Sequence, residues 1–226
     1  MFGWKSEGRK AATRTSEFSG AYDGGAVGVM SGIVAGTRVA TAIGWRPVEA
    51  VTVGDKVLTF DGGLQRVTGV RRQVLWSGEG DCPRRFWPLS VPAGALGNRE
   101  VMSLLPRQPV MVESDSAEEL FGDPFALIPA MSLDDINGIT RAPPRGPVEV
   151  ITLQFADDQV VFANSGALFL CPAACDLVSD ALEGRAASPY LPLPLDEARS
   201  LTLMIEQEAS GVCGFHTHAA EMAAAA

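Results

Sequence analysis

The residues with the greatest capacity for metal chemistry lie near the C-terminal end, where Cys213, His216 and His218 form the pattern Cys-x-x-His-x-His. Thiolate and imidazole groups are preferred zinc ligands, but a structural zinc site needs four of them. Three ligands in a stretch rich in glycine and alanine make a weak metal site. We therefore expect these residues to lie in a solvated tail, and we expect neither a metal nor another cofactor.

Two further groups of residues could carry redox or cation chemistry. Pro172 lies between Cys171 and Cys175 and indicates a turn, so two separate thiols are expected there. The aspartate pairs 134–135 and 157–158 lack further oxygen ligands at the fixed spacing that a cation site needs, so both predict turns.

Cysteine usage bears on the compartment. Four unevenly placed cysteines in 226 residues do not resemble a disulfide framework. A cytoplasmic location is therefore expected by default. Export by a route that uses no N-terminal signal would leave no trace in the sequence.

Charge and hydropathy exclude several partner classes. The chain has a net charge of -9, and phosphate binding needs clustered cations. The arginine pairs 71–72 and 84–85 are short and predict solvated strand ends. No segment approaches the roughly 20 apolar residues of a membrane-spanning helix, and no apolar region follows the basic N-terminal residues. We expect no nucleic-acid partner and no membrane span, whereas a protein partner of unknown identity remains open.

Turn residues divide the chain into many short β-prone segments. Gly44, Pro47 and Gly54-Asp55 separate the first two, and Asn164-Ser165-Gly166 separates two later ones. The expected strands are 37–41, 55–59, a return strand at 64–74, an interrupted strand at 101–112, and a meander of 148–155, 159–163 and 167–170. A helix is expected from about Pro194 to near Gly211, with acidic residues in its first turn. The sequence thus predicts an all-β domain at 32–206, a disordered leader at 1–31 and a weakly ordered tail at 207–226.

The segment Gly32–Phe60, GIVAGTRVATAIGWRPVEAVTVGDKVLTF, resembles the opening block of the Hint superfamily, which comprises hedgehog autoprocessing domains and inteins. Three later segments resemble blocks of bacterial Hint proteins in the same order: SVPAGALG at 90–97, FADDQVVFA at 155–163 and LPLDEAR at 193–199. The resemblance implies a disc of short antiparallel strands followed by a helix. It also implies descent from domains that cleave or splice themselves.

The chain departs from the family at the positions that carry this chemistry. The family's nucleophile, a Cys or Ser four residues before the Gly-Thr pair, corresponds to Gly32. The family's histidine corresponds to Gln108, and its later His-Glu pair corresponds to Asp158-Gln159. A cleaving domain needs a nucleophile and an acid-base group, and an amide supplies no proton near neutral pH. No His-Asn pair closes the domain.

Two interpretations follow from these departures. In the favoured one the chain is a catalytically silent Hint scaffold that binds a partner. In the alternative it cleaves itself near Ser31 or Gly32, with Ser31 as nucleophile and Asp158 as base. Asn164-Ser165 resembles an intein splice junction, but Asn-Ser-Gly between two apolar runs is also an ordinary turn, which is what we expect.

Overall fold

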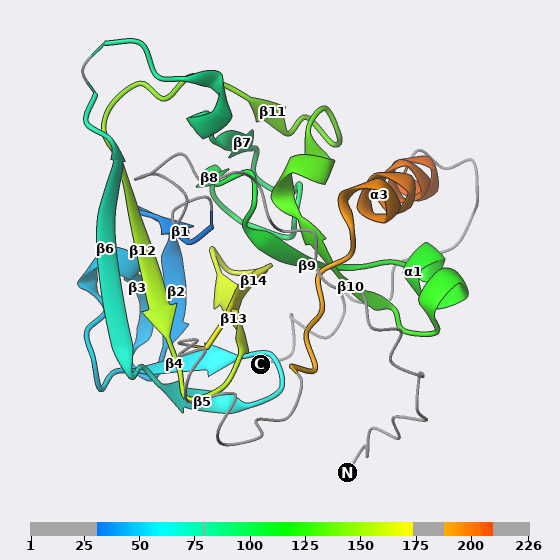
Figure 1. Cartoon of the computed structure of the whole chain (residues 1–226). Helices are drawn as coiled ribbons and strands as arrows, with labels where there is room; N and C mark the ends of the chain where they lie inside the picture. The colour runs from blue at the N-terminus through cyan, green and yellow to red at the C-terminus, as the bar shows by residue number, and fades with distance from the viewer. Residues whose placement is uncertain (1–30, 79, 174–187, 210–226) are drawn as a thin grey trace, which may run out of the picture.

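The computed structural model describes residues 31–78, 80–173 and 188–209 (Figure 1). The leader expected at 1–31 lies outside these residues except for Ser31. Cys175, Cys213, His216 and His218 also lie outside them, and so does the tail expected at 207–226 apart from its first three residues.

The described residues form two antiparallel β-sheets (Figure 1). The first has the strand order β11-β7-β8-β1-β12-β6, and the second has the order β10-β9-β14-β13-β2-β4-β5, with β3 paired to β2. The strands are β1 (Ile33–Val34), β2 (Arg38–Thr41), β3 (Gly44–Pro47), β4 (Lys56–Thr59), β5 (Gly63–Arg66), β6 (Gly69–Trp76), β7 (Leu89–Val91), β8 (Met102–Leu104), β9 (Pro109–Glu113), β10 (Phe125–Pro129), β11 (Thr140–Arg141), β12 (Val148–Gln154), β13 (Gln159–Ala163) and β14 (Ala167–Cys171). This architecture confirms the all-β prediction.

Within the described ranges, helical segments are few and, apart from one, short. They are α1 (Asp115–Phe121), α3 (Leu195–Ala209) and the 3-10 turns η1 (Val48–Ala50), η2 (Arg84–Phe86) and η3 (Ala130–Leu133). Ala198 and Leu201 of α3 are fully buried in the main core. The Thr202 hydroxyl donates to the carbonyl of Ser132, which ties α3 to η3. The predicted C-terminal helix is therefore confirmed.

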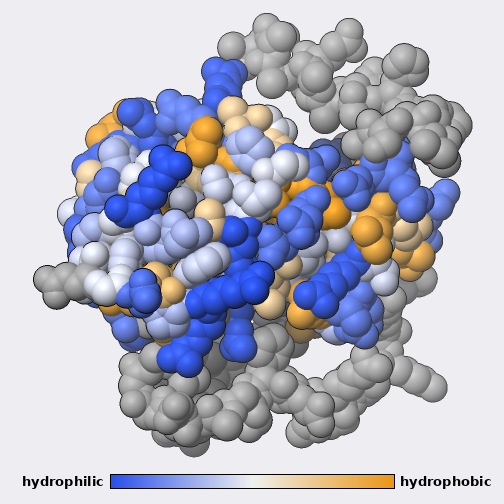
Figure 2. Space-filling model, turned by 90° about the horizontal axis from the view of Figure 1, so that it is seen from above, coloured by the Kyte–Doolittle hydropathy of each residue, from blue (hydrophilic) through white to orange (hydrophobic). Residues whose placement is uncertain are grey.

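One apolar core joins the two sheets. Ile33 of the first sheet and Val161 and Phe169 of the second belong to the same buried cluster. Most of the surface seen from above is hydrophilic, and the hydrophobic residues there form small patches (Figure 2). No helix among the described residues has the length and apolar character needed to cross a membrane.

The single return strand expected at 64–74 is wrong, because the chain changes sheets at Val67-Thr68. The amide of Val67 donates to the carbonyl of Asp55, beside β4, whereas the amide of Thr68 donates to the carbonyl of Gln154 in β12. The two peptide groups therefore bond to different sheets, and β5 and β6 are separate strands.

The meander expected over 148–170 is also only half right. β13 and β14 do pair as a hairpin. However, β12 pairs with β1 and β6 in the other sheet. The turn at 157–158 therefore carries the chain from one sheet to the other, and the sequence pattern did not reveal that change.

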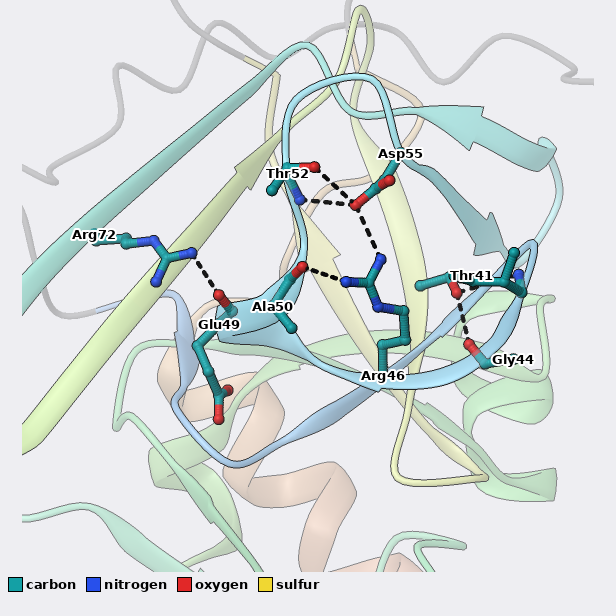
Figure 3. Close-up of polar contacts among 9 residues, drawn as sticks. Thr41, Gly44, Arg46, Glu49, Ala50, Thr52, Asp55 and Arg72 are labelled. Carbon is teal, nitrogen blue, oxygen red and sulfur yellow. Dashed lines mark hydrogen bonds and ion pairs between the residues drawn. The ribbon is translucent and has the colours of Figure 1, made fainter.

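The loop after β3 is held by a compact polar network around Asp55 (Figure 3). The Asp55 carboxylate accepts from the backbone amide of Thr52 at 2.8 Å and from its hydroxyl at 3.1 Å, and Arg46 lies 3.3 Å away. The amide bond from Thr52, chiefly, lowers the pKa of Asp55. Gly54 has a φ of 99°, which a residue with a side chain rarely adopts. The predicted structural turn at Gly54-Asp55 is confirmed.

Candidate functional site

The fold brings Gly32 and Gln108 into direct contact, although 76 residues separate them in the sequence. Gly32 lies immediately before β1, and Gln108 lies immediately before β9 in the other sheet. The amide of Gly32 donates to Oε1 of Gln108 at 2.7 Å. The side chain expected at the family's histidine position thus contacts the peptide bond that precedes the position expected for the family's nucleophile.

Three hydrogen bonds fix the side-chain amide of Gln108. Its Nε2 donates to the carbonyl of Leu170 at 2.9 Å and to that of Pro109 at 3.1 Å, while Oε1 accepts from Gly32. Gln108 is only 1% exposed. Because the nitrogen has carbonyls as partners and the oxygen has an amide, each end of the group has a partner of the right kind. The group is therefore a satisfied buried link between β1, β9 and β14.

Gly32 has a backbone geometry that suits glycine alone. Its φ is 136°, and a Cβ atom placed on it would lie 2.6 Å from Cγ1 of Val150 and 3.2 Å from Oγ1 of Thr152. Real Cβ atoms do not approach other atoms as closely as 2.6 Å. A cysteine or serine therefore cannot occupy this position unless the Val150 side chain or β12 shifts.

The structure places Asp158 and Gln159 in other surroundings. Asp158 accepts from the backbone amide of Ala173 at 2.6 Å and lies near Tyr190, whose pKa is raised by burial and further by Asp61 and Asp158. Gln159 pairs with Cys171 across β13 and β14, and its buried Oε1 has no hydrogen-bond partner among the described residues. Within the described ranges, neither residue bonds to Gly32 or Gln108.

The remaining residues that the sequence singled out lie in a turn, in the core or beside Gly32. Ser31 is half-buried and precedes Gly32. Asn164 and Ser165 have φ values of 43° and 71° between β13 and β14, which confirms the predicted turn. Burial raises the pKa of the Cys171 thiol to about 12, so this thiol is neutral near pH 7. The part of the chain that the structure describes holds no group of three His, Cys, Asp or Glu side chains placed to bind a metal.

Sequence reasoning missed a polar cavity at the other end of β1. It has a volume of about 200 Å³ and is lined by Ala35, Gly36, Thr37, Val101, Met102, Ser103 and Asn164. Thr37 belongs to the Gly-Thr pair of the opening block, and Asn164 was identified only as a turn residue. Nothing in the sequence indicates that these two residues meet β8, because the lining comes from three distant segments.

The chain resembles one protein family and several solved structures. The family model described as the Hint domain matches residues 32–168, more than half of the chain. A bacterial intein-like domain from Clostridium thermocellum is 18% identical, with 62% of this chain and 97% of that chain covered and a TM-score of 0.42. A splice-inactive AceL NrdHF class 3 split intein variant is 14% identical, with 64% and 99% covered and a TM-score of 0.41. No curated protein matches the chain.

Proposed function

The chain belongs to the Hint-domain family, and from that premise we propose that it is a Hint domain that does not cleave itself and that acts as a binding or scaffold module. The proposal depends on one observation. Gly32 and Gln108, which we expect at the family's nucleophile and histidine positions, are joined by a hydrogen bond between uncharged groups.

Self-cleavage makes two demands that this arrangement does not meet. An amide carbonyl must be attacked by a nucleophile, and the amide nitrogen that leaves must receive a proton. Gly32 has no side chain to attack with. Gln108 presents its oxygen to the Gly32 amide, so it accepts a hydrogen bond from this nitrogen and, in this orientation, has no proton to give it. Both roles are therefore vacant at the point where the chemistry would take place.

The surrounding contacts support a scaffold. Gln108 links the start of β1 to the end of β14 through Leu170, and the crowding of Gly32 by Val150 fixes β1 against β12. Buried polar groups that are fully bonded add rigidity and a defined arrangement. A rigid junction between two sheets suits a module that presents surfaces to a partner, whereas a cleaving site has to release one side of this junction.

The competing function is self-cleavage that starts at Ser31. Its hydroxyl would attack the carbonyl of Met30, the amide nitrogen of Ser31 would take up the proton, and the peptide bond would become an ester. A base at Ser31 is needed for this step. Asp158, the base expected from the sequence, bonds to Ala173 and lies near Tyr190. This placement favours the non-cleaving function.

Intact mass spectrometry of the freshly expressed full chain tests the proposal. We expect a single species at full mass, and we expect it to persist during incubation with hydroxylamine, which cleaves esters. A fragment that begins at Ser31 or Gly32 would overturn the proposal.

The matched control for this experiment is Ser31→Ala, which removes the hydroxyl and keeps the backbone. Under the proposed function, the variant and the wild type give identical spectra. If a fragment forms in the wild type and is lost in Ser31→Ala, the chain is an autoprocessing protein with Ser31 as its nucleophile.

A further inference from the structure

The polar cavity at the end of β1 combines buried side chains with unused hydrogen-bonding groups. Thr37 is 3% exposed and Asn164 is 5% exposed, and both line the cavity. Oδ1 of Asn164 accepts from the amide of Arg38 at 2.8 Å, whereas its Nδ2 has no partner among the described residues. The hydroxyls of Thr37 and Ser103 likewise bond to no other described residue. Ser103 is half-buried, and none of the three groups is sealed off from the cavity, so each can bond to a ligand there.

The cavity exists because two strands separate. β1 pairs with β8 only at Ile33 and Leu104. Beyond that pair the chain turns away through Ala35 and Gly36 towards β2, and Met102 and Ser103 of β8 line the space that it leaves. The cavity therefore lies where the chain leaves the first sheet for the second.

The composition of the lining restricts the ligand. No charged side chain is among the lining residues, and a buried ionic ligand would need one. The polar contributors are two hydroxyls and one amide. Val101, Met102 and Ala35 supply apolar atoms beside them. At about 200 Å³ the cavity is smaller than the roughly 300–1,000 Å³ of sites for drug-sized ligands.

We propose that this cavity binds a neutral polyhydroxylated ligand of the size of one sugar ring. Hydroxyls of such a ligand both donate and accept, and they match the hydroxyls of Thr37 and Ser103 and the free amide hydrogens of Asn164. Its carbon-bound hydrogens match the apolar atoms of Val101, which lines the cavity together with Ser103. This site is separate from the Gly32–Gln108 contact and does not depend on the proposed function.

Ligand-observed saturation-transfer NMR on the full chain tests the proposal with a panel of neutral sugars: glucose, galactose, mannose and N-acetylglucosamine. Glucosamine, glucuronate and acetamide serve as probes with a positive charge, a negative charge and an amide group. We expect transfer to at least one neutral sugar and weaker transfer to its charged counterparts. Absence of transfer to every neutral sugar, or equal transfer to the charged ones, would overturn the proposal. Transfer to acetamide alone would also overturn it.

Two variants locate the binding. Thr37→Val keeps the shape of the buried side chain and removes its hydroxyl, and Ser103→Ala removes the second hydroxyl. Each should weaken binding about tenfold, the usual effect of a lost hydrogen bond. The control is Ser90→Ala, which lies opposite Ser103 on β7 and does not line the cavity. If all three variants bind as the wild type does, the sugar binds elsewhere and the proposal fails.

Discussion

The two ends of β1 differ in how their polar groups are used. At its start, the amide of Gly32 and the whole side-chain amide of Gln108 are paired, and no space remains for another atom. Four residues further on, Gly36 has no atom within 4 Å of a Cβ placed on it, and Thr37 and Asn164 face a cavity with unused groups. We call the start of β1 the closed end, where the sequence resemblance led us to expect the family's chemistry, and we call the opposite end the open end.

This contrast teaches that a glycine at an expected nucleophile position can be built into the packing around it. A plain loss of the nucleophile would leave a gap at position 32, which a cysteine could refill. Here the backbone has a φ of 136° and β12 fills the space. The closed end is thus packed for structure, and we expect the stability of the fold to depend on it far more than on the open end.

The largest expected difference in stability comes from adding a methyl group at each end of β1. Gly32→Ala should lower the free energy of unfolding by about 3 kcal/mol, because the new Cβ would collide with Val150 and the φ of 136° is strained for alanine. Gly36→Ala is the matched control, since its φ of 89° is also strained but its surroundings are empty. It should cost about 1 kcal/mol. Urea unfolding measures both.

Equal losses for the two alanine variants would contradict the contrast, because they would show that only backbone strain matters. A double variant sharpens the test. Val150→Ala removes the atom that Gly32→Ala would strike, so the second change should cost less in that background than in the wild type.

The next largest loss of stability is expected from a substitution at Gln108. Gln108→Leu keeps the approximate volume but leaves the amide of Gly32 and the carbonyl of Leu170 without their partner. We expect a loss of about 2 kcal/mol in the free energy of unfolding, since unsatisfied buried polar groups cost about 1–3 kcal/mol. Gln65→Leu is the control, because Gln65 makes its side-chain bond to Gly62 at an exposed position. If both variants lose the same stability, Gln108 is not a structural link.

Features set by local turn chemistry were predictable from the sequence. The turn at Gly54-Asp55, the turn at Asn164-Ser165 and the helix that starts near Pro194 all depend on neighbouring residues, and all are present. The sequence does not show where the chain changes sheets, because Val67 and Thr68 are consecutive residues whose partners lie far away.

The candidate site likewise has features that the sequence predicts and features that only the structure shows. The positions of Gly32 and Gln108 followed from the order of the sequence blocks, but their bond and the crowding by Val150 are tertiary facts. The cavity at Thr37, Ser103 and Asn164 could not be predicted, because no local pattern joins these residues. A resemblance between sequences locates positions, and only packing reveals whether they are open or closed.

A smaller effect is expected at Cys171, which follows the Leu170 carbonyl that binds Gln108. Burial raises the pKa of this thiol from 9.0 to about 12. Because the folded state holds the proton more tightly, the stabilisation is complete below pH 9 and is lost as the pH rises from 9 towards 12. At pH 10 the loss should be about 1.4 kcal/mol relative to pH 8. The measurement is urea unfolding at both pH values for the wild type and for Cys171→Ala.

The alanine variant has a different stability at pH 8, so each protein is compared with itself. The other cysteines and tyrosines titrate in both proteins and cancel in the comparison. A pH dependence that is the same in the wild type and in Cys171→Ala would show that the thiol is not shielded at the closed end.

The smallest effect on stability is expected at the open end. Thr37→Val replaces a residue that is only 3% exposed, within the range of the core residues. However, its hydroxyl bonds to no described residue, so its removal leaves no partner unsatisfied. We expect the free energy of unfolding to change by less than about 0.5 kcal/mol in urea unfolding. A loss as large as that of Gln108→Leu would show that the Thr37 hydroxyl has a structural partner, and the two ends of β1 would then not differ as described. A small loss, together with the weaker sugar binding expected of the same variant, would assign Thr37 to a ligand and Gln108 to the fold.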